Sequence, residues 1–163
     1  MSINTQLTEL SEVASEIEDL VDDVVKKSCD LPEALLLFKP TDSSWCIKEV
    51  VGHLIDSASN NHQRMVRLQI NDRLVFPDYQ HDNEKWVKLQ GYTKRPWPEL
   101  LALWQQFNRH IAHLIRNVDG RCLEYVWIQD SKSRISLADL MRDYLRHLKL
   151  HLDQIDEIKQ RWK

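Results

Sequence analysis

Hydrophobic residues recur at helical spacing in four long stretches of the chain. In residues 4–27 the apolar positions follow steps of three and four and form one stripe: Leu7, Leu10, Ala14, Ile17, Leu20, Val21 and Val24. The same period predicts helices over residues 47–70, 98–117 and 137–161. Because each of these helices has one apolar face to bury, the pattern predicts an all-α four-helix bundle.

The segments between the four helices predict shorter elements. Pro32 favours the start of a short helical turn, and residues 83–90 form a candidate short helix anchored by Trp86. Residues 119–135 alternate weakly between apolar and polar side chains. We therefore expect a short hairpin there, turning at residues 130–133, just before the last helix.

Composition narrows the class of protein. The chain has 163 residues, which suits one domain over residues 1–163, and 25 acidic against 22 basic residues give a net charge of −3. With no Lys/Arg block, a nucleic-acid partner is not expected. The longest apolar run, residues 34–38, is too short to span a membrane. Three cysteines without C-x-x-C spacing and an N-terminus unlike a signal peptide predict a cytoplasmic protein.

Two histidines on the last predicted helix are spaced for metal binding. His147 and His151 are four residues apart, which places both imidazoles on one helix face, close enough to bind the same ion. The alternative is that both are hydrogen-bonded within the core, since a buried imidazole needs partners for its ring nitrogens. Leu148 follows His147, so the H-E-x-x-H motif of zinc proteases is absent.

A third histidine lies on the second predicted helix. His53 falls on the flank of the apolar stripe together with Ser57, Asn60 and Arg64. Small polar residues beside a core stripe suit the wall of a pocket. Three histidines from two bundle helices would form a three-nitrogen set with a coordination position left open, as in catalytic rather than structural metal sites.

The histidine segments resemble a known family. Residues 45–56, WCIKEVVGHLID, look like the W-[ST]-x-x-E-[VI]-x-x-H-[LI]-x-[DE] segment of the DinB-like superfamily. Residues 144–151, YLRHLKLH, resemble its second motif, H-x-x-x-H on the final helix. Residues 128–137, IQDSKSRISL, look like the turn before that helix in the YfiT-like branch. The resemblance covers most of the chain, and one departure is Cys46 at the usual Ser/Thr position.

The resemblance implies a fold, a metal site and a chemistry. The fold is an up-down-down-up four-helix bundle, often a homodimer. The metal is divalent, commonly zinc or nickel, and its ligands carried over to this chain are His53, His147 and His151. Family members with known activity are mostly transferases or isomerases in which a metal-bound low-molecular-weight thiol is the nucleophile. Others are labelled as metal-dependent hydrolases.

Three functions follow as hypotheses, and the catalytic residues stay unassigned. A metal-bound thiol would attack an electrophilic small molecule, a metal-bound water would hydrolyse one, or the bundle would act without catalysis. Glu49 and Asp56 are candidates to accept a hydrogen bond from an imidazole N–H. In a hydrolase, either carboxylate would instead accept a proton from the metal-bound water. Arg64 would hold a carboxylate or form a surface salt bridge, and Tyr144 is a core aromatic or a pocket hydroxyl.

Overall fold

Four long helices form most of the protein. The computed structural model describes residues 2–75, 82–128 and 133–162. Its long helices are α1 (Ile3–Ser28), α3 (Ile47–Ile70), α5 (Trp97–Arg116) and α6 (Leu137–Arg161). Each predicted long helix is confirmed to within one residue at either end, because a long amphipathic period defines a helix better than any local signal.

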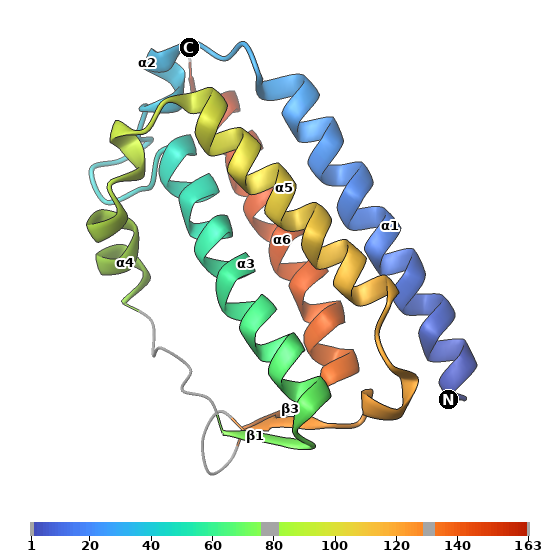
Figure 1. Cartoon of the computed structure of the whole chain (residues 1–163). Coiled ribbons are helices and arrows are strands. Elements are labelled where there is room, and N and C mark those ends of the chain that lie inside the picture. Colours follow the sequence, from blue (N-terminus) through green and yellow to red (C-terminus); the bar gives the residue numbers. More distant parts are fainter. Residues whose placement is uncertain (1, 76–81, 129–132, 163) are drawn as a thin grey trace.

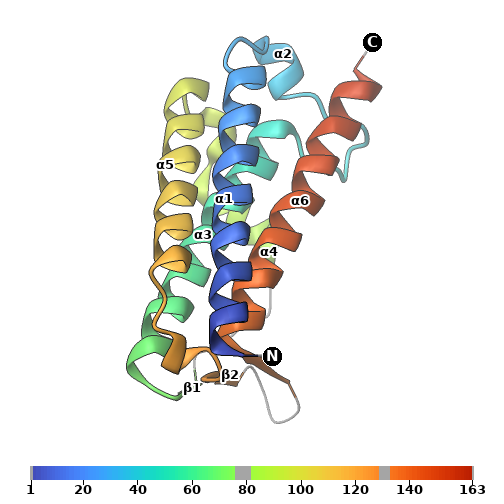
Figure 2. The ribbon, with the colours of Figure 1, turned by 90° about the vertical axis from the view of Figure 1, so that its right-hand side faces the viewer.

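The helices run in the order that the family resemblance implies. Figure 1 shows α1 and α6 rising toward one end of the bundle, while α3 and α5 descend toward the other. Helix α1 packs against α5 and α6, and α3 packs against the same two helices from the other side. Figure 2 shows α1 between α5 and α6. The four-helix bundle is therefore confirmed, with up-down-down-up topology.

Short helical segments lie in the connections between the long helices. They are α2 (Glu33–Leu36), α4 (Asn83–Gln90) and the 3₁₀ turns η1 (Tyr92–Lys94) and η2 (Gly120–Cys122). The short helix predicted at residues 83–90 is confirmed. Val87, with 2% of its surface exposed, is the buried residue of α4, whereas Trp86 is only half-buried.

A small sheet closes the end of the bundle where α6 begins (Figure 1). Strand β2 (Val126–Ile128) pairs antiparallel with β3 (Arg134–Ser136), which confirms the predicted hairpin. Most of the turn expected at residues 130–133 lies outside the described residues. The sequence did not predict β1 (Arg73–Val75), which pairs parallel with β2. Its pairing with β2 joins two segments far apart in the chain, which local alternation does not predict.

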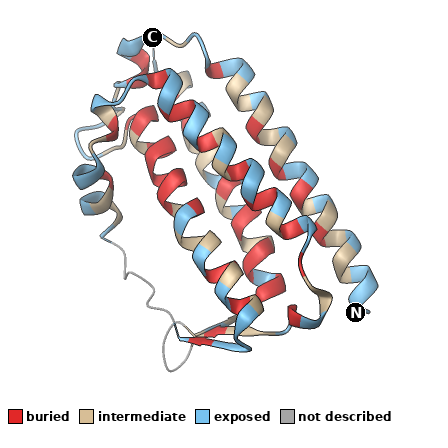
Figure 3. Ribbon diagram, viewed as in Figure 1, coloured by how far each residue is buried: buried red, intermediate tan, exposed pale blue. Residues whose placement is uncertain are grey.

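The core follows the inner faces of the long helices, as the burial colours of Figure 3 show. Trp104 of α5 is fully buried. Among the described residues, the buried polar or charged side chains are concentrated on α3, which carries Lys48, His53, Asp56 and Arg64. Within the described residues, none of the helices combines the length and the apolar character needed to cross a bilayer. The buried polar side chains of α3 make this helix the place to look for a functional site.

Candidate metal centre

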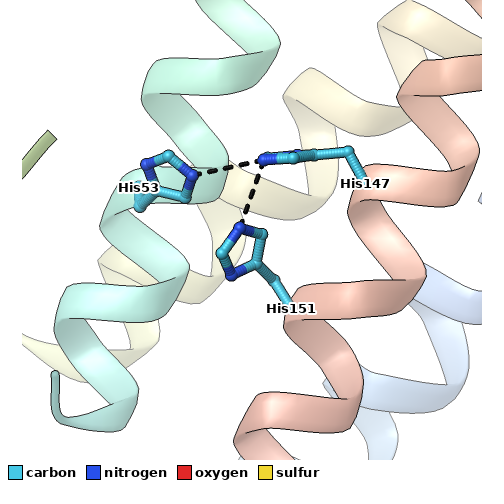
Figure 4. Close-up of side chains that lie close together, drawn as sticks. All are labelled: His53, His147 and His151. Carbon is cyan, nitrogen blue, oxygen red and sulfur yellow. Dashed lines mark hydrogen bonds between the residues drawn. The ribbon is translucent and has the colours of Figure 1, made fainter. Parts of the chain in front are cut away.

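Three histidines converge between α3 and α6. His53 comes from the middle of α3, and His147 and His151 come from successive turns of α6, with their rings directed at one another (Figure 4). The Nε2 atom of His147 lies 3.4 Å from Nε2 of His53 and 3.2 Å from Nε2 of His151. The three side chains are buried or half-buried. The structure thus brings together the three histidines that the sequence singled out.

The spacing of the nitrogens fits a metal ion. Nitrogen ligands about 2.0 Å from one tetrahedral ion lie about 3.3 Å from each other, which matches the two separations from His147, 3.4 and 3.2 Å. The ligand atoms of the three residues all lie within 4.8 Å of one another. Without an ion these nitrogens lie within hydrogen-bond distance, and the tautomer of each ring decides which one donates. An ion between them would use the lone pair of each ring instead.

The outer nitrogens of two of these histidines have partners that orient the rings. His151 Nδ1 lies 2.8 Å from Oε1 of Gln154, and because an amide oxygen only accepts, Nδ1 donates and Nε2 keeps its lone pair. His147 Nδ1 lies 3.4 Å from Oγ of Ser57. Burial lowers the pKa of His151, with the bond to Gln154 opposing the shift, so the neutral form that binds metals is favoured. The sequence predicted Ser57 beside the site but not Gln154.

The two carboxylates proposed as imidazole partners bond elsewhere. Glu49 accepts a hydrogen bond from the backbone N–H of Cys46 at 2.9 Å, and Lys39 donates to it at 3.0 Å. It therefore caps the start of α3, and it is not among the described residues that line the cavity. Asp56 accepts hydrogen bonds from Tyr92 and Gln90. The expectation that Glu49 or Asp56 would hold an imidazole N–H finds no support in these contacts.

Trp45 and Cys46 belong to the same sequence motif as His53, but neither is part of the histidine cluster. The ring of Trp45 lies 5.0 Å from the His53 ring and 6.5 Å from the His151 ring, measured between centroids, and is stacked on the latter. Cys46 is buried, and burial raises the pKa of its thiol to about 11. The cluster of possible metal ligands found among the described residues does not include Cys46.

A cavity of about 210 Å³ opens beside the histidines. His53 and His147 form one part of its wall, and Trp86, Trp127 and Tyr144 contribute aromatic surface. Its polar lining consists of the side chains Asp56, Ser57, Asn60, Asn61, Arg64, Asn83 and Asp143. The share of liquid volume taken by one water molecule is about 30 Å³, so this space suits a small organic molecule with several polar groups.

Arg64 and Tyr144 both belong to this cavity. Arg64 is buried, and its guanidinium lies 3.9 Å above the ring of Trp127. Its Nη1 also donates to Oδ1 of Asn61 at 3.3 Å. The hydroxyl of Tyr144 donates to Oδ1 of the fully buried Asn108 at 2.6 Å, so Tyr144 is a core residue as well as part of the wall.

Comparison with known proteins shows the family of this chain. A family model described as the DinB superfamily matches residues 7–155. The chain belongs to the DinB superfamily. Membership agrees with the two motifs that hold His53, His147 and His151.

Similar proteins carry a common description. One named putative metal-dependent hydrolase, from Oceanobacillus iheyensis, is 25% identical over 152 residues, covering 93% of this chain and 87% of its own length. Another of that name, from Bacillus cereus, is 21% identical over 159 residues, covering 98% of this chain and 86% of its own. A solved structure titled "YfiT from Bacillus subtilis is a probable metal-dependent hydrolase with an unusual four-helix bundle topology" aligns with a TM-score of 0.71 and 21% identity. It covers 99% of this chain and 89% of that one and supports the fold.

Proposed function

We propose that this DinB protein is a divalent-metal enzyme acting on a small molecule held in the cavity between α3 and α6. His53, His147 and His151 would hold the ion, zinc or nickel by the family resemblance. The observation that carries the proposal is the convergence of the three histidines, with Nε2 of His147 3.2 Å from that of His151 and 3.4 Å from that of His53, beside a cavity. Three protein ligands with free space next to them are typical of catalytic metal sites.

The first candidate chemistry uses a low-molecular-weight thiol as nucleophile. A bound divalent ion ionises a coordinated thiol at neutral pH. Side chains of the cavity would bind and orient the reactants. Arg64, fixed over Trp127, would hold a carboxylate of the thiol or the substrate, since a guanidinium binds planar oxyanions in bidentate fashion. Attack would form a sulfur–carbon bond and release the leaving group with its electron pair.

The second candidate is hydrolysis, with water in place of the thiol. The observation that favours it is Asp56, a carboxylate that lines the same cavity as His53 and His147. In this reaction Asp56 would take the proton of the attacking water. The names of the relatives from Oceanobacillus iheyensis and Bacillus cereus point the same way.

One pair of assays separates these candidates. Protein reloaded with zinc, and separately with nickel, is given a millimolar thiol with 1-chloro-2,4-dinitrobenzene, or 4-nitrophenyl acetate with no thiol. Thioether formation above that of the His147→Ala/His151→Ala variant supports the transferase, and ester hydrolysis without thiol supports the hydrolase. Absence of both activities would contradict both and favour the non-enzymatic bundle.

A variant pair tests the role of Arg64. Arg64→Ala should raise the KM for the reactant that carries the carboxylate by about tenfold or more, because a charge-assisted hydrogen bond to that reactant is lost. Arg116→Ala, which removes a guanidinium from the outer edge of α5, should leave KM unchanged. An equal effect of the two substitutions would rule out a specific role for Arg64. The homodimer and the cytoplasmic location stay predictions, and sedimentation velocity would test the first.

A further inference from the structure

A second pair of histidines lies on the far side of α3. His62 follows His53 by nine residues, about two and a half turns, so its side chain leaves the opposite side of the helix about 14 Å along the axis. There it meets α5, which packs against α3 (Figure 1). The ring of His110 on α5 lies 5.2 Å from the His62 ring, measured between centroids, at an interplanar angle of 42°. Neither residue belongs to the histidine cluster or to the cavity lining found among the described residues.

The separation of these two rings fits a shared metal ion. With a metal–nitrogen distance of about 2.0 Å and a ring radius of about 1.2 Å, two imidazoles at a tetrahedral angle have centroids about 5.2 Å apart. The rings of His53 and His147 in the metal centre are 5.3 Å apart, which is nearly the same. His113, the next histidine of α5, differs because its ring lies 6.5 Å from that of His110, beyond the roughly 6.4 Å of even a linear arrangement. The geometry therefore favours the pair that bridges the two helices over the pair along α5.

The surroundings leave the nitrogens of this pair available. In the part of the chain that the structure describes, His62 and His110 form no hydrogen bond or ion pair, and their contacts are between rings. Phe107, three residues before His110, meets the His62 ring edge-on with centroids 6.0 Å apart. His62 is half-buried and His110 is exposed, so packing holds one ring while water reaches the other. Burial lowers the pKa of His62, and the charge of His110 adds to the shift, so the neutral form that binds metals is favoured.

We propose that His62 and His110 bind a second divalent transition-metal ion, which bridges α3 and α5 at the surface of the bundle. Imidazole ligands select zinc, nickel or copper over magnesium and calcium, which prefer oxygen. Water fills the remaining positions, so this ion binds more weakly than one held by three histidines and is lost when free metal is removed. Because the pair is assembled only in the folded protein, binding stabilises the bundle as free metal rises.

Equilibrium dialysis against buffered zinc tests the site by counting bound ions. Wild type should bind one ion tightly and a second at higher free zinc. His110→Ala changes an exposed residue and leaves the core intact, and His62→Gln keeps most of the side-chain volume. Each should weaken the second ion at least about tenfold, because the remaining imidazole binds without its intramolecular partner. The tight ion should stay in both variants.

His113→Ala is the matched control. It removes an exposed histidine of α5 one turn beyond His110 and should leave both ions in place. Loss of the second ion in His113→Ala, with retention in His62→Gln, would assign the ion to the two histidines along α5 and overturn the bridge between helices.

Thermal unfolding gives a second readout of the same site. In His147→Ala/His151→Ala, which lacks two ligands of the first ion, the Tm should still rise with added zinc. Adding His110→Ala to this variant should remove most of the rise. Nickel should act like zinc, and magnesium should leave the Tm unchanged. A rise with zinc that is the same with and without His110 would contradict the proposal.

The outcomes separate this site from the proposed function, on which it does not depend. Retention of the second ion in both His62→Gln and His110→Ala would overturn the new site, and so would a wild type that binds only the tight ion up to millimolar zinc. Both results leave the first ion and its chemistry standing. A wild type that binds only the weak ion would contradict the proposed function and support the new site.

Discussion

The interface between α1 and α5 and the interface between α3 and α6 come from the same kind of amphipathic helix but differ in content. The first is filled with fully buried apolar side chains, including Ile17 of α1 and Trp104 of α5, and ion pairs run along its outer edge. The second holds His53, Asp56 and His147 where apolar residues would pack. The comparison indicates that one interface mainly stabilises the bundle and that the other carries its chemistry.

The difference predicts separate effects on stability and on metal binding. Apolar burial is the main favourable term in folding, so the α1–α5 interface should dominate the free energy of unfolding. Buried polar groups contribute little net stability unless every partner is present. Substitutions between α3 and α6 should therefore affect metal and ligand binding more than folding.

The largest expected effect is in the apolar interface. Ile111→Ala, at a fully buried position of α5, should lower the free energy of unfolding by about 2–5 kcal/mol, because the substitution leaves a cavity. Urea denaturation measures the loss, and the metal content of the folded protein should not change. A loss of bound metal from the folded Ile111→Ala protein would show that the two interfaces do not act separately.

The next effect concerns the orientation of a metal ligand. Gln154→Ala removes the acceptor for His151 Nδ1 and should weaken metal affinity by about 10- to 100-fold, as outer partners of ligating histidines do. Competition with a fluorescent zinc chelator measures the affinity. Gln160→Ala, an exposed glutamine of the same helix, is the matched control. Unchanged affinity in Gln154→Ala would show that packing alone orients His151.

Acid should weaken the metal-free protein through the buried imidazole. Because burial lowers the pKa of His151 below 6.5, its contribution to stability is complete above that value and is lost as the pH falls through the folded-state pKa. The free energy of unfolding should thus fall on acidification by more in metal-free wild type than in His151→Gln. Parallel pH curves for the two proteins would contradict this assignment.

The smallest expected effect is at the edge of the apolar interface. Arg116 pairs with Glu18 at 2.7 Å, with both side chains 35% exposed, so Arg116→Ala should cost no more than about 1 kcal/mol. The hydrogen bond from Arg116 lowers the pKa of Glu18, so this contribution is present above the carboxylate's ordinary pKa and is lost as the pH falls through the lowered one. Added salt should reduce it. A cost of several kcal/mol would mean that the ion pair, not the apolar core, joins α1 to α5.

The sequence predicted the parts of this structure that depend on local periodicity. The four long helices and the pair His147/His151 follow from spacing along one helix, and the hairpin follows from alternation. The addition of His53 needed the family motif as well, because a partner on another helix leaves no mark on the spacing. The same reasoning explains why Ser57 was expected near the site but its contact with His147 was not.

The unpredicted parts depend on contacts between distant segments. The parallel pairing of β1 with β2 joins residues far apart in the chain. The contact between Tyr92 and Asp56 is likewise long-range, although Gly52, a lone glycine inside a strongly periodic helix, was an available signal of a close approach. Gln154 could have been found from its position three residues after His151.

Metal content tests the central claim most directly. Elemental mass spectrometry on tag-free wild-type protein, beside His147→Ala/His151→Ala, counts the divalent ions held by each. Our account predicts nearly one ion for each wild-type chain and almost none in the double variant. Absence of metal from wild type, even after reloading with zinc and with nickel, would contradict it and make the three histidines part of the core.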